Sequence, residues 1–78
     1  MGTLLMRKSY TIHSKVLSYF TEIVHEESIP VNVDIGSKYV DGNGDTQIDV
    51  LLEYREPDED CVNEVLTRAI INVTEQYK

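Results

Sequence analysis

Hydrophobic and polar residues alternate at the start of the chain, where every second position from Leu4 to Ile12 is hydrophobic except Lys8. Side chains two residues apart share one face of a β-strand, so this pattern predicts a strand from Leu4 to Ile12. Lys8 places a single charge on the otherwise apolar face of that strand.

After Ser14 the hydrophobic residues recur three or four positions apart, which predicts a helix with one buried face. The Ser14 hydroxyl can cap the first turn, and Pro30 ends the element because proline disfavours helical geometry in the residue before it. We therefore expect the helix to run from Ser14 to about Glu27. Its buried positions are Val16, Leu17, Phe20, Ile23 and Val24.

Two further runs of alternating residues, 31–40 and 47–55, predict a pair of β-strands. Between them, Asn43-Gly44 is the strongest two-residue signal for a type I′ turn, in which both central residues have positive φ. The two runs therefore predict a β-hairpin with one apolar face. The residues expected on that face are Val31, Val33, Ile35, Ser37, Tyr39, Ile48, Val50, Leu52 and Tyr54.

The final helix is expected to begin at Pro57, whose fixed φ suits a first helical position, and to reach Tyr77. The three acidic residues after Pro57 complement the positive end of the helix dipole. A hydrophobic stripe marks the buried face of this helix and consists of Val62, Val65, Leu66, Ala69 and Val73.

The predicted order is β-α-β-β-α within a single small domain of residues 1–78. A connection from a strand through a helix to a parallel strand is right-handed, so both helices should lie on one face of a three-stranded sheet. The expected fold is a two-layer α/β sandwich of the α+β type with a split βαβ strand order. Its outer sheet face and both sheet edges stay open.

The segment 40–49 carries oxygen-bearing side chains at alternate positions, as calcium-binding loops do. An EF-hand loop needs glycine at its sixth position and glutamate at its twelfth, where this chain has Thr46 and Leu52. The hairpin is therefore the preferred interpretation, and we expect no metal and no cofactor. A calcium-responsive module would use Asp41, Asn43, Asp45, Gln47 and Asp49 as ligands.

Candidates for catalysis are weak. His13 and His25 lack the spacing of metal ligands and a carboxylate to orient them. Cys61 is the only cysteine, and the acidic residues around it disfavour a reactive thiolate. We therefore expect no enzymatic activity. A chain with one cysteine forms no internal disulfide and suits a reducing compartment, so we expect a cytoplasmic protein without membrane association.

The formal net charge of −7 is unevenly placed along the chain. Residues 1–40 carry four acidic and four basic side chains, whereas residues 41–78 carry ten acidic and three basic ones. The basic residues are too few and too scattered to follow a phosphate backbone, so we expect no direct nucleic-acid binding. We expect instead a protein partner with a basic surface, bound by Asp41, Asp45, Asp49, Glu53, Glu56, Asp58, Glu59, Asp60 and Glu64.

Closely spaced carboxylates resemble a ladder of phosphates. The sequence therefore favours a small acidic interaction or regulatory domain, including an inhibitor or nucleic-acid mimic that occupies a basic groove on its partner. Three alternatives stay open. In the first, the acidic residues only keep a small protein soluble. The second is the calcium-responsive module. The third is a structural assembly subunit that uses the sheet edge and the outer apolar face.

Self-association is a further expectation, because apolar residues fall on surfaces that are otherwise polar. Leu5, Val40 and Leu51 fall on the expected outer face of the sheet, and Ile71 falls opposite the buried stripe of the last helix. Together on a domain with a thin core and open edges they favour a symmetric homodimer, with Leu51 and Ile71 at its interface.

Two known families share parts of this pattern. The stretch from Arg7 to Ile12, followed by a helix, resembles the start of ribbon-helix-helix repressors, but residues 31–35 predict a strand where that fold has its second helix. The element order, ending in a helix that opens with acidic residues, is similar to that of the small DinI-type modulators of RecA. This similarity of topology covers most of the chain, which lacks that family's aromatic-rich C-terminal signature. The resemblance favours a regulatory role and implies no site residues.

Overall fold

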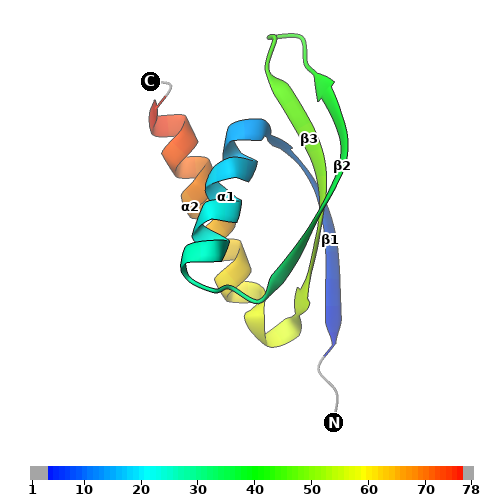
Figure 1. Cartoon of the computed structure of the whole chain (residues 1–78), viewed down its shortest axis with the longest axis vertical. Coiled ribbons are helices and arrows are strands. Elements are labelled where there is room, and N and C mark those ends of the chain that lie inside the picture. The colour runs from blue at the N-terminus through cyan, green and yellow to red at the C-terminus, as the bar shows by residue number, and fades with distance from the viewer. Residues whose placement is uncertain (1–3, 77–78) are drawn as a thin grey trace.

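The computed structural model describes residues 4–76 and folds them into a three-stranded sheet with two helices on one side of it (Figure 1). The elements are β1 (Leu5–His13), α1 (Ser14–Glu26), β2 (Val31–Val40), β3 (Thr46–Arg55), the 3-10 turn η1 (Glu56–Asp58) and α2 (Glu59–Gln76). The predicted β-α-β-β-α order and two-layer α+β fold are confirmed. The expected end of the last helix, at Tyr77, lies outside the described residues.

Strand β3 lies between β1 and β2 and pairs with both in the antiparallel sense. β1 and β2 are therefore parallel to each other and separated by one strand, which is the predicted split βαβ arrangement. This order makes β1 and β2 the two edges of the sheet.

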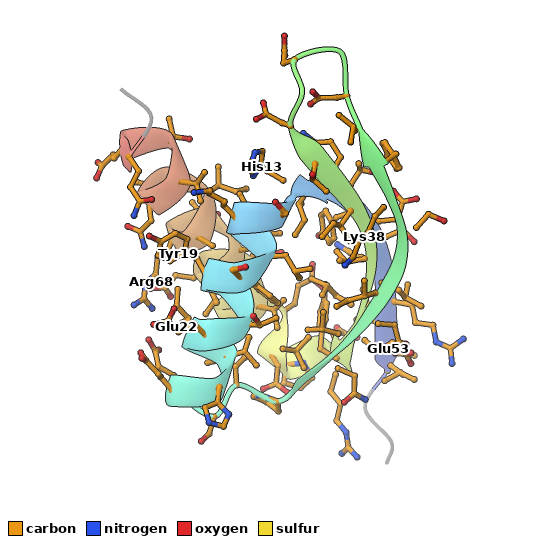
Figure 2. The ribbon with its side chains drawn as sticks, turned by 45° about the horizontal axis from the view of Figure 1, so that its top comes forward. His13, Tyr19, Glu22, Lys38, Glu53 and Arg68 are labelled. Atoms are coloured by element: carbon orange, nitrogen blue, oxygen red, sulfur yellow. The ribbon has the colours of Figure 1, made fainter. Side chains whose placement is uncertain are left out.

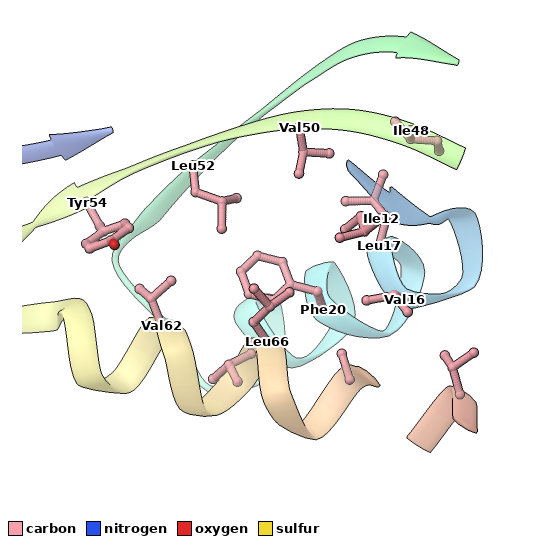
Figure 3. Close-up of a cluster of buried hydrophobic side chains, with 13 residues drawn as sticks. Ile12, Val16, Leu17, Phe20, Ile48, Val50, Leu52, Tyr54, Val62 and Leu66 are labelled. Carbon is pink, nitrogen blue, oxygen red and sulfur yellow. The ribbon is translucent and has the colours of Figure 1, made fainter. Parts of the chain in front are cut away.

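The core lies between the inner face of the sheet and the two helices (Figure 3). Phe20 of α1 is fully buried and lies between Leu52 of β3 and Leu66 of α2. The predicted α2 stripe is buried throughout, and no charged residue is buried within residues 4–76. The hydrophobic periodicity of the sequence therefore located the core correctly.

Polar contacts join the two helices outside the core. Arg68 Nη1 lies 3.1 Å from Glu27 Oε2, and the Gln76 amide donates a hydrogen bond to the Tyr19 hydroxyl. Figure 2 shows Tyr19 and Arg68 on this exposed side of the helical layer. The layer therefore has a polar outer surface as well as an apolar inner one.

Lys8, the charge on the apolar face of the first predicted strand, reaches an acidic partner at the start of α2. Its Nζ lies 3.4 Å from Glu59 Oε1. The hydrogen bond to Glu59 raises the pKa of Lys8, and the attraction of the Glu59 charge acts in the same direction. Because β1 is an edge strand, the ammonium group meets this carboxylate beside the core and not inside it.

A β-bulge interrupts β2. Gly36 and Ser37 both lie opposite Asp49, because the pairing with β3 shifts between Ile35 and Lys38. A Cβ atom at Gly36 would lie 3.3 Å from the Asp49 carbonyl oxygen, so the close approach of the two strands favours glycine here.

The bulge overturns the predicted faces of the second half of β2, because one extra residue reverses the alternation of every side chain after it. Tyr39, predicted on the apolar face, points to the outer face, where its hydroxyl donates to Asp49 Oδ1 at 3.1 Å. Val40, expected on the outer face, lies opposite Thr46 on the other side of the sheet.

The hairpin is confirmed, but its turn is not the predicted type I′ turn. Gly44 has a φ of +83°, whereas Asn43 does not have positive φ. The Gly44 N–H donates to the Asp41 carbonyl at 3.1 Å, and the Asp41 N–H donates to the Asp45 carbonyl at 2.9 Å. These bonds enclose a three-residue loop, in which a type I turn is followed by a left-handed glycine.

Helix α1 begins at Ser14, but its N-cap is His13 and not the predicted Ser14. The His13 backbone is extended, with φ −62° and ψ 143°, and its Nδ1 accepts a hydrogen bond from the Lys15 N–H at 3.0 Å. Serine is a far more common N-cap residue than histidine, so the sequence predicted Ser14 as the cap where the structure has its neighbour His13.

The molecule is elongated, with principal extents of 47 × 24 × 16 Å. The β2–β3 hairpin projects beyond the helices at one end, and η1 with the start of α2 forms the other end (Figure 1). Neither helix within residues 4–76 is long and apolar enough to cross a membrane.

Candidate functional site

The nine acidic residues expected to bind a partner lie in three separate groups. Asp41 and Asp45 are at the hairpin end, and Asp49 and Glu53 face outward from β3. The five acidic residues from Glu56 to Glu64 are at the opposite end of the long axis (Figure 1). The fold therefore does not bring the nine carboxylates into one surface.

At the hairpin end, Asp41 is held by the loop itself. Its carboxylate accepts hydrogen bonds from Gln47 Nε2 at 2.9 Å and from the amides of Asn43 and Asp45 at 2.9 and 3.1 Å. These bonds lower the pKa of Asp41, and the bond from Gln47 has the largest effect. Asp45 Oδ1 lies 3.4 Å from His13 Nε2. The Asp41 carboxylate therefore shapes the loop and has little capacity left for a partner.

The calcium alternative has no matching geometry. Asp41 directs its oxygens at amide groups, whereas Asp49 lies on the outer sheet face and accepts from the Thr11 hydroxyl at 2.7 Å. Within residues 4–76 no group of three or more His, Cys, Asp or Glu side chains is arranged to hold a metal ion. The expected ligands do not converge.

The outer face of the sheet is polar and partly self-neutralised. Glu53 Oε2 lies 3.2 Å from Arg7 Nε, and Figure 2 shows Glu53 on the side of the sheet away from the helices. A shallow depression of about 430 Å³ lies between the strands. Its outward-facing lining consists of Ser9, Thr11, Asp34, Gly36, Asp49 and Leu51.

Four carboxylates in η1 and the first two turns of α2 have no partner within residues 4–76. Glu59 is paired with Lys8. The side chains of Glu56, Asp58, Asp60 and Glu64 form no hydrogen bond or ion pair with any other part of residues 4–76. This group is the part of the predicted surface that remains available to an external cation.

The charge also separates between the two layers of the fold. The helical layer, residues 14–30 and 56–76, carries nine acidic side chains against two basic ones, a formal charge of −7. The sheet and hairpin, residues 4–13 and 31–55, carry five acidic against four basic, a formal charge of −1. The acidic excess therefore lies on the helical side of the molecule.

Three further acidic residues belong to this surface although the sequence reasoning missed them. Glu22 and Glu26 of α1 and Glu75 of α2 are exposed, and none has a side-chain partner within residues 4–76. Figure 2 shows Glu22 projecting from the helical layer on the same side as Arg68. We define the acidic helical face as Glu22, Glu26, Glu56, Asp58, Asp60, Glu64 and Glu75.

The two residues expected at an oligomer interface lie on opposite sides of the molecule. Leu51 lies half-buried on the outer face of the sheet, and Ile71 is 48% exposed on the side of α2 away from the core. A two-fold symmetric interface, which uses the same patch on both copies, would therefore include only one of them.

Comparisons with protein families, curated proteins and solved structures find no match for the chain.

Proposed function

We propose that this protein is a small acidic interaction module that binds the basic surface of a protein partner through the acidic helical face. The observation that supports this function is the charge of −7 on the helical layer, set against −1 on the sheet and hairpin. Such a difference orients the molecule in the field of a basic partner and steers the helical side toward it.

The state of the carboxylates supports the same face. Glu53 and Glu59 are already paired with Arg7 and Lys8, so binding a partner's cation would first break those contacts. The seven carboxylates of the acidic helical face have no such contact to lose within residues 4–76. An external arginine or lysine therefore forms its most favourable ion pairs with these seven carboxylates.

In its inhibitory form, the module occupies a groove that would otherwise bind nucleic acid. Asp60 and Glu64 lie one helical turn apart on α2, and Glu56 and Asp58 precede them in η1. A row of fixed negative charges on a rigid helix presents a basic groove with the feature that it recognises in a phosphate backbone.

Capture of partners from the native host by the immobilised protein tests the proposal. The double variant Asp60→Asn/Glu64→Gln should weaken binding of the captured partner by roughly tenfold, since two exposed ion pairs contribute about 1–2 kcal/mol. Asp34→Asn/Asp45→Asn is the matched control, because it removes the same charge from the sheet and hairpin. Equal weakening by both variants, or weakening by the control alone, would show that the helical face is not the contact.

Competition separates the mimic from a simple interaction module. If the module occupies a nucleic-acid groove, excess duplex DNA should displace it from the captured partner. If the complex persists in excess DNA, the module is not a nucleic-acid mimic. Binding through the acidic helical face would still be consistent with that result.

A further inference from the structure

The two layers of the fold differ in width. Neighbouring strands are spaced by about 4.8 Å, whereas packed helices lie about 8–10 Å apart and each is about 10 Å wide. Two helices side by side therefore span about 20 Å, more than three strands supply. Part of the helical layer must extend past an edge of the sheet, where an additional strand would complete the sandwich.

The position of α2 identifies β1 as that edge. Glu59, at the start of α2, contacts Lys8 of β1, so this side of the helix faces β1. Ile70 follows eleven residues later, about three helical turns on, and therefore lies on the same side. Its side chain is 44% exposed, as expected for a residue that extends beyond the strand beneath it.

The β1 edge is also the more regular of the two. β1 pairs with β3 without a break from Leu5↔Arg55 to His13↔Gln47, whereas the bulge at residues 36–37 interrupts β2. A regular edge accepts another strand more readily than an edge interrupted by a bulge.

The backbone directions show which residues of β1 face the open edge. The Leu4 carbonyl accepts from the Glu56 N–H on the β3 side. Since backbone groups alternate along a strand, the even-numbered residues of β1 bond to β3. The odd-numbered residues, among them Leu5, Arg7, Ser9 and Thr11, direct their N–H and C=O groups away from it. Within residues 4–76 no strand lies on that side.

Beyond its first turn, the side of α2 next to this edge carries no carboxylate. Asn63, Thr67, Ile70 and Thr74 are exposed and uncharged, and they follow one another at helical spacing. Glu64 and Glu75 lie further round the helix, whereas Asp60 and the paired Glu59 lie at the N-terminal end of the strip that these four residues form. A second acidic molecule could therefore approach the helical layer along this strip without meeting the main negative charge.

We propose that the β1 edge binds the β1 edge of a second copy of this chain. A two-fold axis pairs the strands in the antiparallel sense and joins two three-stranded sheets into one sheet of six. The two α2 helices then meet along the uncharged strip beside Ile70. The acidic helical faces stay exposed on the same side of the dimer, which therefore presents two of them to a partner.

One register of the paired β1 strands is consistent with their charges. With Ser9 on the axis, each Ser9 exchanges two hydrogen bonds with its copy, and Lys8 lies opposite Tyr10 of the second copy. A register with Lys8 on the axis would bring two ammonium groups together and is disfavoured. Arg7 then lies opposite Thr11 of the second copy, so no like charges face each other directly.

Sedimentation equilibrium tests this dimer, with an expected mass of twice the 8.9 kDa chain. Ser9→Pro removes one outward N–H and should give a monomer, while the bonds of β1 to β3 remain. Ile70→Arg should raise the dimer dissociation constant roughly tenfold or more, because it adds charge and bulk on the strip along which the two α2 helices meet. Ile71→Arg, the same change at the next residue, should leave the constant unaltered.

The dimer should tighten as salt rises, because screening weakens the repulsion between two chains of −7. This is the opposite of the salt response expected for partner binding through the acidic helical face, so the two proposals fail independently. A wild-type monomer at all concentrations and salts overturns the dimer. So does a dimer that responds equally to Ile70→Arg and Ile71→Arg, and the Ile70 variant keeps the test decisive if Ser9→Pro does not fold.

Discussion

Tyr54 carries the least satisfied polar group in the core. Only 2% of the residue is exposed, and its hydroxyl has no hydrogen-bond partner within residues 4–76. Burial raises the pKa of Tyr54. The alternation of β3 predicted an inward-facing aromatic ring at this position. It could not predict that the hydroxyl lacks a partner, because partners are supplied by residues distant in the sequence.

Tyr54→Phe should stabilise the protein by about 1 kcal/mol, because it removes a buried hydroxyl and leaves the ring in place. For a domain of this size the melting temperature should rise by about 4–8 °C. Thermal and urea unfolding measure the change. A variant less stable than the wild type would show that the hydroxyl makes a favourable bond, for instance to an ordered water.

The same residue affects stability in alkali. Because the pKa of Tyr54 is raised in the folded state, the unfolded chain loses this proton first, and stability falls as pH rises past about 10. The raised pKa of Lys8 also makes stability decline there, as its ammonium deprotonates above the usual value of 10.5. Tyr54→Phe should therefore lose less stability than the wild type between about pH 9 and 11 in urea unfolding, and an equal loss would contradict this assignment.

Asp41 affects stability at low pH. Its pKa is lowered by its hydrogen bonds, so its contribution to stability is present above the usual value of 3.8 and is lost as pH falls through the folded-state pKa. Hydrogen exchange at the Asn43 and Asp45 amides should therefore lose protection below about pH 4. In Asp41→Ala, these two amides should be unprotected at neutral pH as well. Protection that survives in the variant would mean that the loop does not depend on the carboxylate.

At the scale of the elements, the helices and strands were predictable because each has a clear period. The α2 stripe from Val62 to Val73 and the inner row of β3 from Ile48 to Tyr54 are both buried as their spacing indicates. The errors arose where one residue changes local geometry. The extra residue at Gly36–Ser37 moved Tyr39 to the other face, and no period in the sequence marks where such an insertion occurs.

The N-cap of α1 offers a direct test of one such error. His13→Ala should destabilise the protein by about 1 kcal/mol or more, because the Lys15 N–H loses its acceptor. Ser14→Ala should cost much less, since Ser14 is already the first helical residue. His13→Asn, which restores a good cap, should recover part of the loss in urea unfolding. If Ser14→Ala proves the more costly change, serine is the cap and the His13 assignment is wrong.

At the scale of the whole molecule, the sequence predicted one acidic surface from nine residues that lie in three groups in the fold. It identified Glu56, Asp58, Asp60 and Glu64, which are close together in the chain and remain without partners within residues 4–76. It also included Glu53, whose partner Arg7 lies 46 residues away, a pairing that only the fold reveals. Glu22 and Glu26 were missed because charge was compared between halves of the chain, whereas the fold divides it between layers.

Partner binding and dimer formation would act together if both hold. A dimer that presents two acidic helical faces on one side gains affinity for a partner with repeated basic sites, because the second contact forms at high effective concentration. Ile70→Arg should therefore weaken binding to such a partner without touching a carboxylate of the acidic helical face.

The salt dependence of partner binding tests the central claim most directly. Calorimetric titration of the captured partner should show an affinity that falls steeply as salt rises from low concentration to about 0.5 M. The dependence should become shallower for Asp60→Asn/Glu64→Gln and stay unchanged for Asp34→Asn/Asp45→Asn. An affinity that persists at high salt, or a dependence altered equally by the two variants, would contradict a contact made by the acidic helical face.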